Sequence, residues 1–426
     1  MPRLGAGGAP PVLPIALLWL GAAALVAGTV ALSFSPRLLI GHSGSAGMVA
    51  LVHTFTLGFV SLVFAGTLQQ LPAVMFVTRL AWPRLGYVST PLLLIGTVLI
   101  VCGFAAGFAG RLLALGGLTL SVAWLLLLTQ HLATALRRWP KDAGGQALVM
   151  SVVFLTLTVV AGLILAGART TPQVAATVGY PVGLHMTLGF FGAFLLGIIG
   201  SGQKLLQMFA LSKGGAQWRV RSSAWLVAAG ITAEALRAFA VLDSGLMPPI
   251  LIGAAALLQL HEVHAIHKRR LRRKLEAPIQ RYVLAHLFLP VAALLWLAGL
   301  PVAAAAAFLV GFTGMAVSGM LVKIMSFLVW TATFAGSATG GVAGGAPLLR
   351  DLVRDELEPV TTWGLAAGTL ALCAALATQL VPLAYLAANL LLIGAISQLL
   401  QVTNIVLSTI RAKRRIEVSS ARESTA

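Results

Sequence analysis

Three apolar segments of the sequence share one spacing of glycine and phenylalanine. They read HTFTLGFVSLVFAGTLQQLP (residues 53–72), HMTLGFFGAFLLGIIGSGQKLLQMF (185–209) and VGFTGMAVSGMLVKIMSFLVW (310–330). In each, a Gly-Phe pair is followed by six residues and a second glycine, which gives the glycine pairs Gly58 and Gly66, Gly189 and Gly197, Gly311 and Gly319. Each segment is long and apolar enough to be a membrane helix, and small residues at such spacings are typical of close helix packing in a bilayer.

The composition agrees with a membrane location. Of the 426 residues, 59% are hydrophobic and only 9% are charged, whereas a soluble domain carries about 25% charged residues. So few charges cannot cover a water-exposed surface, and a soluble protein is therefore excluded. Disorder and a disulfide scaffold are excluded as well, because apolar residues dominate and there are only two cysteines. The remaining class is an all-α, polytopic membrane protein.

Charged or proline-rich segments separate the apolar runs and so delimit the membrane spans. A run of about 18 or more apolar residues can cross a bilayer as a helix. We predict one integral membrane domain over residues 1–426 that contains twelve transmembrane helices. These lie at residues 11–34, 45–71, 88–109, 112–136, 145–168, 177–202, 222–242, 246–267, 280–299, 302–330, 361–379 and 381–408.

The glycine motif falls on the second, sixth and tenth of these spans, so it recurs at every fourth helix. Packing through small residues explains the glycines themselves, but it does not explain the constant interval. A fixed interval is the signature of an internal repeat. We therefore predict a pseudo-threefold bundle that is built from three related four-helix units.

Lysine and arginine are distributed unevenly between the loops. Nearly all of them, from Arg3 onward, fall on one side of the predicted bundle, and the other side keeps only Arg37, Arg111 and Arg169. Positively charged loops face the cytoplasm, so both termini are predicted to be cytoplasmic, with residues 409–426 as a cytoplasmic tail. The net charge of +18 therefore reflects topology and attraction to the anionic lipids of the bilayer. Nucleic acid is not a predicted partner.

Twelve spans, a threefold repeat and a histidine near the outer end of the second and sixth helices resemble subunit I of the haem–copper oxidase superfamily. The phrases HMTLG and KLLQMF (within 185–209) and KIMSFLVW (323–330) resemble a divergent single-chain branch, and the nearest family is the NnrS-like membrane haem–copper proteins of the nitric-oxide response. The resemblance implies haem b as a cofactor, with copper as a second metal. It carries the helix 2 haem ligand onto His53 and the helix 6 copper ligand onto His185.

The sequence departs from the oxidases where their other metal ligands lie. The repeat places the helix 10 equivalents near Ala306 and Ala307, and the tenth span contains no histidine. The seventh span lacks the histidine pair for copper and offers Glu234 and Arg237 instead. A normal terminal oxidase is therefore excluded, and whether the chain is an enzyme stays open. What the resemblance still implies is a protein of the bacterial cytoplasmic membrane in electron transfer or nitric-oxide handling, with nitric oxide or a redox protein as its partner.

His53 and His185 lie at similar depth in the outer halves of their helices. If both bind iron, the site is a bis-histidine b-type haem; if only one binds, the open axial position would suit a gas. The alternative is that each histidine hydrogen-bonds to a neighbouring helix. Glu234 and Arg237 share a helix face, so they either neutralise each other or act separately, with Arg237 clamping a haem propionate and Glu234 carrying protons.

Other polar residues occupy the inner halves of the predicted spans. Lys323, Lys204 and Gln70 end the motif helices, where they either reach the lipid headgroups or line a polar path for protons. His131 and His286 are weaker candidates for the ligands of a second haem.

A further cluster of histidines ends the eighth span. His261, His264 and His267 share one broad helix face, and three histidines at this spacing are candidate ligands for copper or zinc at the inner surface. The alternative is an interfacial helix end over anionic lipid.

Two other functional classes compete with a haem protein. A transporter or channel would use Glu234, Arg237 and Lys323 to move protons or a small solute, although transporter repeats usually divide the chain in two. A haem-free assembly partner descended from an oxidase is the third interpretation. An absorption spectrum of the purified protein separates the first class from the others.

Overall fold

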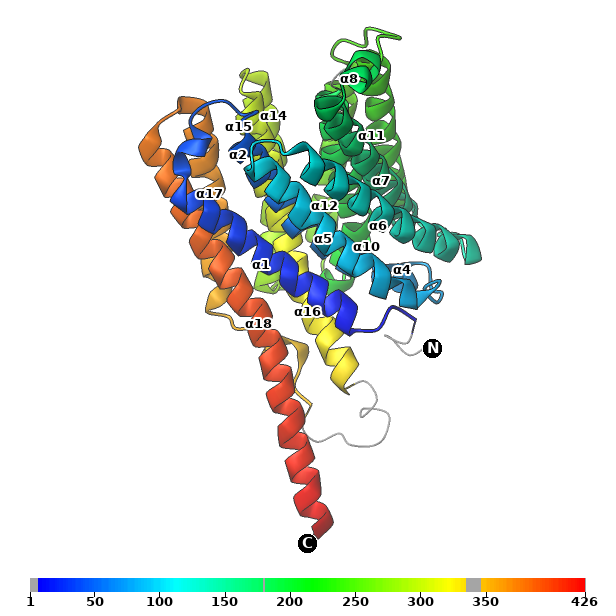
Figure 1. The fold of residues 1–426 in the computed structure, drawn as a ribbon. Coiled ribbons are helices and arrows are strands. Elements are labelled where there is room, and N and C mark those ends of the chain that lie inside the picture. The colour runs from blue at the N-terminus through cyan, green and yellow to red at the C-terminus, as the bar shows by residue number, and fades with distance from the viewer. Residues whose placement is uncertain (1–6, 179–180, 335–345, 426) are drawn as a thin grey trace.

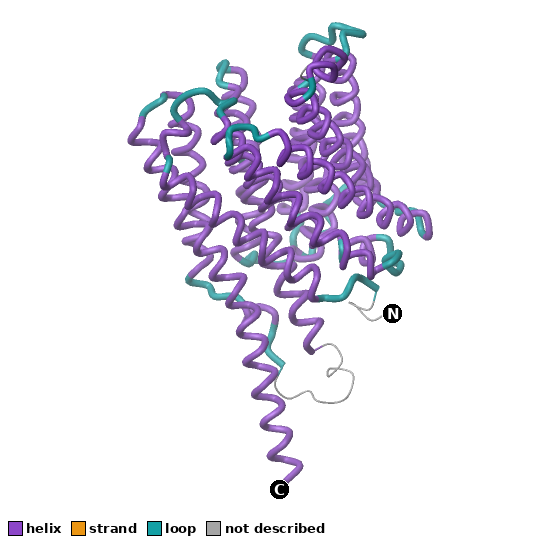
Figure 2. Tube along the Cα trace, in the orientation of Figure 1, coloured by secondary structure: helices purple, strands orange, loops and turns teal. Residues whose placement is uncertain are grey.

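The computed structural model describes residues 7–178, 181–334 and 346–425. The chain is 83% helical and the described residues form no strand, which confirms the predicted all-α class (Figures 1 and 2). Arg3, which entered the topology prediction, lies outside the described residues.

The helices follow one another along the chain with short connections. The first four predicted spans contain α1 (Val12–Phe34), α2 (Ala46–His53), α3 (Leu62–Leu68), α4 (Leu71–Met75), α5 (Gly86–Ala105) and α6 (Gly110–Arg137). The next four contain α7 (Ala143–Thr170), α8 (Pro172–Val178), α9 (Val182–Thr187), α10 (Leu196–Ala210), α11 (Gln217–Ala238) and α12 (Met247–Lys268). The last four contain α13 (Ala277–Ala285), α14 (Phe288–Leu297), α15 (Pro301–Ala306), α16 (Met315–Phe334), α17 (Leu357–Thr378) and α18 (Val381–Thr425).

Short helical segments complete the fold. Three are single 3₁₀ turns: η1 (Pro36–Leu39), η3 (Pro83–Leu85) and η6 (Leu349–Leu352). The other three are π-helical: η2 (Thr54–Ser61), η4 (Leu188–Leu195) and η5 (Ala307–Gly314). The π segments join their flanking α-helices into continuous spans at Ala46–Leu68, Val182–Ala210 and Pro301–Phe334.

Eleven helices of the described residues are long and apolar enough to cross a membrane, so the chain is a multi-pass membrane protein. The remaining predicted span, residues 222–242, corresponds to α11. This segment is helical over 22 residues, but Arg219, Arg221, Glu234 and Arg237 make it too polar to be counted with the eleven. The total of twelve crossings stays a prediction.

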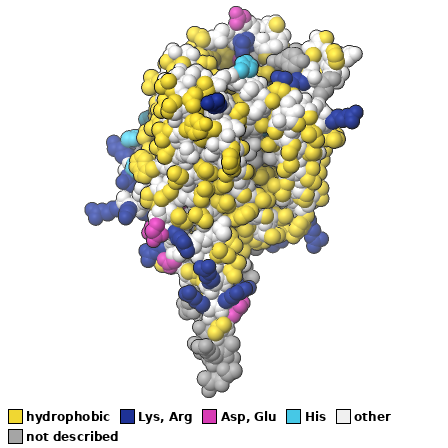
Figure 3. All heavy atoms as spheres, turned by 60° about the vertical axis from the view of Figure 1, so that its left-hand side comes forward, with side chains coloured by type: hydrophobic (Ala, Val, Ile, Leu, Met, Phe, Trp, Pro, Cys, Tyr) yellow, Lys and Arg dark blue, Asp and Glu magenta, His cyan; other side chains and the backbone are white. Residues whose placement is uncertain are grey.

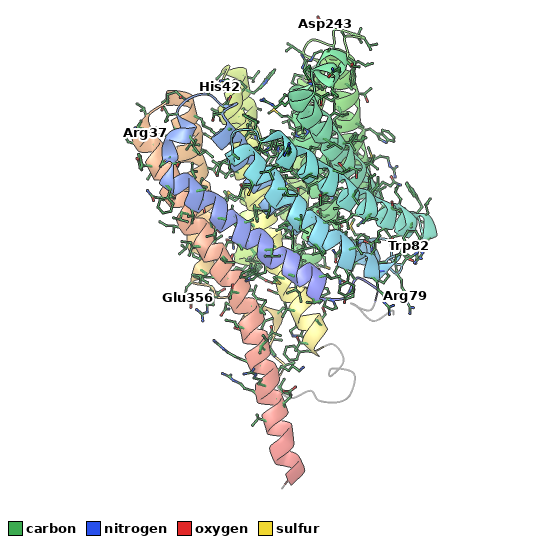
Figure 4. All side chains as sticks on the ribbon, in the orientation of Figure 1. Arg37, His42, Arg79, Trp82, Asp243 and Glu356 are labelled. Atoms are coloured by element: carbon green, nitrogen blue, oxygen red, sulfur yellow. The ribbon has the colours of Figure 1, made fainter. Side chains whose placement is uncertain are left out.

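The surface of the bundle has an apolar middle and charged ends, as expected for a protein that crosses a bilayer. On the face in Figure 3, hydrophobic side chains cover most of the wide middle, and Lys and Arg gather below it and at its edges. Arg37, His42 and Asp243, from predicted outer loops, lie at one end of the bundle, whereas Arg79 and Trp82 lie toward the other (Figure 4). The loops therefore segregate as the alternation of spans requires.

The end of the chain allows a direct test of topology. Helix α18 runs beyond the bundle as an extended rod (Figure 1), and its projecting part carries Arg411, Lys413, Arg414 and Arg415. We expect a reporter fused after Arg415 to be active in the cytoplasm, because positively charged segments stay on that side. A reporter that is active only outside the cytoplasm would invert the predicted inner and outer ends.

The motif glycines lie where their helices touch the first helix of the same predicted unit. A Cβ atom on Gly66 would lie 3.1 Å from the Pro14 carbonyl oxygen of α1, and one on Gly197 would lie 3.0 Å from Ser151 Oγ of α7. On Gly319 it would lie 2.4 Å from the Pro278 carbonyl oxygen of α13. The 2.4 Å contact at Gly319 excludes a Cβ atom unless the backbone moves, and the contacts of 3.0–3.1 Å at Gly66 and Gly197 are tighter than most real Cβ contacts.

The first glycine of each motif behaves in the same way. Cβ atoms on Gly58, Gly189 and Gly311 would lie 3.0, 3.1 and 2.4 Å from the nearest side chains, which belong to α1, α7 and α14 respectively. All six glycines therefore make close contact with the preceding span, and a Cβ atom on Gly197 would also lie 2.9 Å from Phe64 of α3.

The three π segments also coincide with the motif, because each contains one of the three Gly-Phe pairs. In the first and third motif helices the π segment has the same register relative to the final glycine, and in the second it lies three residues closer. π-helical turns are rare in proteins overall, but those that occur are frequently found at functional sites. The residues beside these three segments are therefore candidate functional residues.

The glycine packing predicts a large difference between two glycine-to-alanine variants. Gly319→Ala should lower the free energy of unfolding by about 1–3 kcal/mol, because the new methyl group forces α16 and α13 apart. Gly253→Ala in α12 is the control, since nothing lies within 4 Å of a Cβ atom there and alanine favours the helix. Unfolding of the detergent-solubilised variants measures both. Equal stabilities would contradict the packing role of the motif.

Candidate functional site: a histidine pair in an apolar cavity

A cavity of about 620 Å³ lies inside the bundle, toward the end that carries the predicted outer loops. Its wall comes from α1, α2, α5, α6, α7, α9, α15, α17 and α18 and from all three π segments. The lining is almost entirely apolar, and its charged or titratable residues are His53, His185 and Arg169. This volume lies in the usual range for pockets that bind small molecules and cofactors, about 300–1,000 Å³.

His53 and His185 face each other across part of this cavity. His53 ends α2 and directly precedes η2, and His185 lies in α9 just before η4. Their ring centroids are 6.4 Å apart and their planes differ by 14°. Phe104 packs against His53 with a centroid separation of 4.5 Å. The structure therefore brings together the two histidines that the sequence proposed as ligands.

Each histidine is oriented through Nδ1. His53 Nδ1 lies 2.8 Å from the Val49 carbonyl oxygen, one turn back in its own helix, and His185 Nδ1 lies 3.0 Å from the Thr158 carbonyl oxygen of α7. Because a carbonyl oxygen only accepts, Nδ1 must carry the proton in both rings. Within the described residues neither Nε2 has a hydrogen-bond partner. Metal-bound histidines also donate their other N–H to a carbonyl. The bond from His185 to α7 is at the same time the interhelix hydrogen bond that the alternative interpretation expected.

The separation of the two rings fits one metal ion between them. Metal–imidazole bonds are about 2.0–2.1 Å long, so two rings that bind one ion from opposite sides have centroids about 6 Å apart. Space for His185 itself depends on Gly162, where a Cβ atom would lie 3.1 Å from His185 Cε1. The donor set, the spacing and the apolar wall together suit a haem-type ligand, whose axial positions are commonly histidines.

The cation that lines the cavity is Arg169 at the end of α7. Its guanidinium carbon lies 4.1 Å from the centroid of the Phe108 ring, in cation–π contact. In the sequence, Arg169 indicates only the topology, as one of the three basic residues predicted on the outer side. Arg169 lies near the outer end of α7, two turns beyond Gly162, and this position was the sequence signal for a basic residue near the cavity. The sequence does not show that α7 faces the two histidines; the structure does.

Arg237, the predicted propionate clamp, is engaged elsewhere. Its Nη2 and Nε donate to Glu234 at 2.6 and 3.0 Å, and neither residue lines the cavity. The pair does lie beside the helix that carries His185, since a Cβ atom on Gly183 would be 2.9 Å from Glu234 Oε1. The geometry corresponds to the alternative in which the two charges neutralise each other.

None of the predicted polar residues of the inner ends, Lys323, Gln70 and Lys204, lines the cavity. The Lys323 ammonium group forms an ion pair with Glu276, Gln70 donates to the Ala9 carbonyl oxygen at 2.8 Å, and Lys204 is exposed. Burial would raise the pKa of Glu276, but the hydrogen bonds and charges of Lys323 and Arg272 outweigh it and lower that pKa.

None of the other candidate histidines, His131, His286, His261, His264 and His267, lines the cavity. His131 has a carbonyl oxygen near each ring nitrogen, at 2.7 and 3.0 Å, and His286 contacts the Tyr282 carbonyl oxygen and Gln259 Nε2. His261 and His264 are exposed. Within the described residues no three His, Cys, Asp or Glu side chains form a group that could hold a metal ion.

Fold and site together define a multi-pass helical membrane protein with an internal apolar cavity and two histidines that face it. Comparison of the chain with family models and with curated proteins finds no match. The geometry of the cavity therefore carries the functional conclusion.

Proposed function

We propose that the chain is a haem-binding, oxidase-like membrane protein that holds a b-type haem between His53 and His185. Its role would be electron transfer or nitric-oxide handling. The observation that carries this proposal is the histidine pair, with ring centroids 6.4 Å apart and both Nε2 atoms free of hydrogen bonds within the described residues.

Each part of the site has a role in this proposal. A bound haem would supply one-electron chemistry and a place for gas binding. His53 and His185 would bind the iron, while the Val49 and Thr158 carbonyl oxygens hold their rings in the ligating tautomer. Arg169 offers a positive charge to a carboxylate of the ligand. The mostly apolar wall would favour a small uncharged gas such as nitric oxide over a charged solute.

Three features support an oxidase-like arrangement of twelve helices in three units, with α11 as the seventh span. All six motif glycines pack against the preceding span, and all three motif helices contain a π segment. The most extensive helix pairings are α5 with α6, α11 with α12, and α17 with α18. These are the third and fourth helices of each proposed unit, which is the recurrence expected of a repeat.

The transporter alternative has less support. Glu234, Arg237 and Lys323, on which it depends, are all held in ion pairs, and none of them lines the cavity. A transport site would need at least one of these charges to face a space that a solute can enter.

The test is the absorption spectrum of the protein purified from cells supplied with iron and haem precursors. We expect a Soret band, sharp α and β bands on reduction as in other bis-histidine haems, and about one iron per chain. The absorption spectrum after addition of nitric oxide to the reduced protein would then show whether nitric oxide can replace one histidine as a ligand. Purified protein that is correctly folded and binds no added haem would exclude the proposal and favour a haem-free assembly partner. Copper is measured in the same sample.

A further inference from the structure

Two inner loops are joined into one surface next to the ends of α10 and α12. After α10, Leu211 adopts a left-handed conformation with φ of 51°, which turns the chain back toward α12. The backbone N–H of Leu271 then donates to the Leu211 carbonyl oxygen at 3.3 Å, and Ser212 and Arg270 form an antiparallel bridge. We call residues 211–213 and 268–274 the inner platform.

The inner platform is rigidly attached to the bundle. Ser212 Oγ donates to the Ile266 carbonyl oxygen at 2.8 Å, and Arg270 Nη1 donates to the His267 carbonyl oxygen at 2.7 Å. A Cβ atom on Gly214 would lie 2.3 Å from the Ala265 carbonyl oxygen, so the loop lies directly against α12. The surface is thus held in place by contacts to a membrane helix.

Exposed cations dominate this platform. They are Lys213, Lys268, Arg269, Arg273 and Lys274, and none forms an ion pair within the described residues. The nearby carboxylates are already engaged, since Glu262 is buried against Arg219 at 2.6 Å and Glu276 pairs with Lys323 and Arg272. These five cations therefore have no paired carboxylate within the described residues, whereas Arg272 of the platform pairs with Glu276.

Large apolar side chains are exposed among these cations. Leu271 is 79% exposed and Leu211 is 55% exposed. In water such exposure has a cost, whereas at the edge of a bilayer an apolar side chain can enter the acyl region while flanking cations reach the phosphates. Lys268 ends α12, at the opposite end of that helix from the loop of Asp243 (Figure 4). The platform therefore lies at the level of the headgroups.

We propose that the inner platform is a binding site for anionic phospholipid headgroups. The cations contact phosphate oxygens, and Leu211 and Leu271 contact the glycerol and upper acyl region of the same lipids. This site does not involve haem, so the result of its test does not depend on whether the chain binds haem.

The experiment measures phospholipid binding to the full-length, detergent-solubilised protein by native mass spectrometry. Phosphatidylglycerol and phosphatidylcholine with identical acyl chains are titrated separately, and inorganic phosphate is a third arm. We expect phosphatidylglycerol to bind about tenfold or more tightly than phosphatidylcholine, because each surface cation attracts an anionic headgroup. The quadruple variant Lys268→Gln, Arg269→Gln, Arg273→Gln and Lys274→Gln should lose that preference.

Matched variants separate this site from net charge. Arg411→Gln, Lys413→Gln, Arg414→Gln and Arg415→Gln remove four exposed cations from α18 and should leave the preference intact. Leu271→Ser should weaken phosphatidylglycerol binding without affecting inorganic phosphate. Equal loss from both quadruple variants, or equal affinity for the two lipids in the unmodified protein, would overturn the proposal. Full competition by inorganic phosphate would reassign the site to a free anion.

Discussion

His53→Ala should abolish the Soret absorbance of the purified protein. The proposal makes His53 an axial ligand whose Nδ1 is fixed by the Val49 carbonyl oxygen and whose ring packs against Phe104. Alanine supplies no donor atom, and the described residues that line the cavity offer no third histidine to replace it. The haem content per chain, measured by absorbance and by iron analysis, should fall at least about tenfold, because loss of even an outer-shell partner of a metal ligand typically costs about 10–100-fold in metal affinity.

Two further variants make this result specific. His261→Ala removes an exposed histidine outside the cavity and should retain full haem content. His185→Ala should either lose haem or keep it in a five-coordinate, high-spin form with a broadened spectrum. Retention of the complete low-spin spectrum by His53→Ala would exclude His53 as a ligand and transfer the question to His131 and His286.

The sequence was sufficient for the class and for most of the helices. Long apolar runs can be recognised without tertiary information, because each must satisfy its backbone hydrogen bonds as a helix within the bilayer. The segment α11 shows where hydropathy alone is not sufficient to identify a membrane span. Its apolar stretch predicted a span, but four charged residues leave it outside the eleven helices that hydropathy and length identify, and its role in the bundle depends on packing against α12.

Part of the candidate site could also be predicted. The family resemblance singled out His53 and His185 because they lie near the outer ends of the second and sixth spans, and the structure places them on one cavity. Arg169 and Arg237 show why the rest could not. Both are basic residues near predicted outer helix ends, and the choice between them depends on which helix face meets the cavity, which is set by contacts between residues far apart in sequence.

The π segments were beyond sequence reasoning for a different reason. A π turn differs from an α turn by the hydrogen-bond partner of each N–H group, and no residue preference in the apolar runs reveals that exchange. The shift of η4 by three residues relative to η2 and η5 places His53 directly before its π segment and His185 three residues before its own.

The second large effect is expected at a buried ion pair in the last four helices. Arg281 of α13 and Glu358 of α17 are 0% and 1% exposed, and Arg281 Nη2 donates to Glu358 Oε2 at 2.6 Å. Gln401 Nε2 donates to the other carboxylate oxygen at 2.8 Å, and Gln398 Oε1 accepts from Arg281 Nη1 at 3.2 Å. The network thus ties α13, α17 and α18 together away from water.

Glu358→Gln should lower the free energy of unfolding by about 3–5 kcal/mol, because it leaves the Arg281 charge buried without a counter-charge. The glutamine has nearly the shape of the native residue, so the change isolates the charge. Glu417→Gln is the control, since the exposed Lys413–Glu417 pair at 3.8 Å contributes little. Unfolding of the detergent-solubilised variants, followed by circular dichroism, gives the stabilities.

The double variant Arg281→Met, Glu358→Leu decides whether charge or network is responsible. If the cost of the single variant comes from an unpaired charge, the double variant should be more stable than Glu358→Gln, because an apolar pair can replace a buried ion pair with little loss. If the double variant is the less stable of the two, the hydrogen bonds that Gln398 and Gln401 make to the ion pair carry the energy instead. Both glutamines keep their bonds to Ser318 and to the Arg354 backbone. A single variant as stable as the unmodified protein would mean that water or lipid reaches Arg281, contrary to its complete burial.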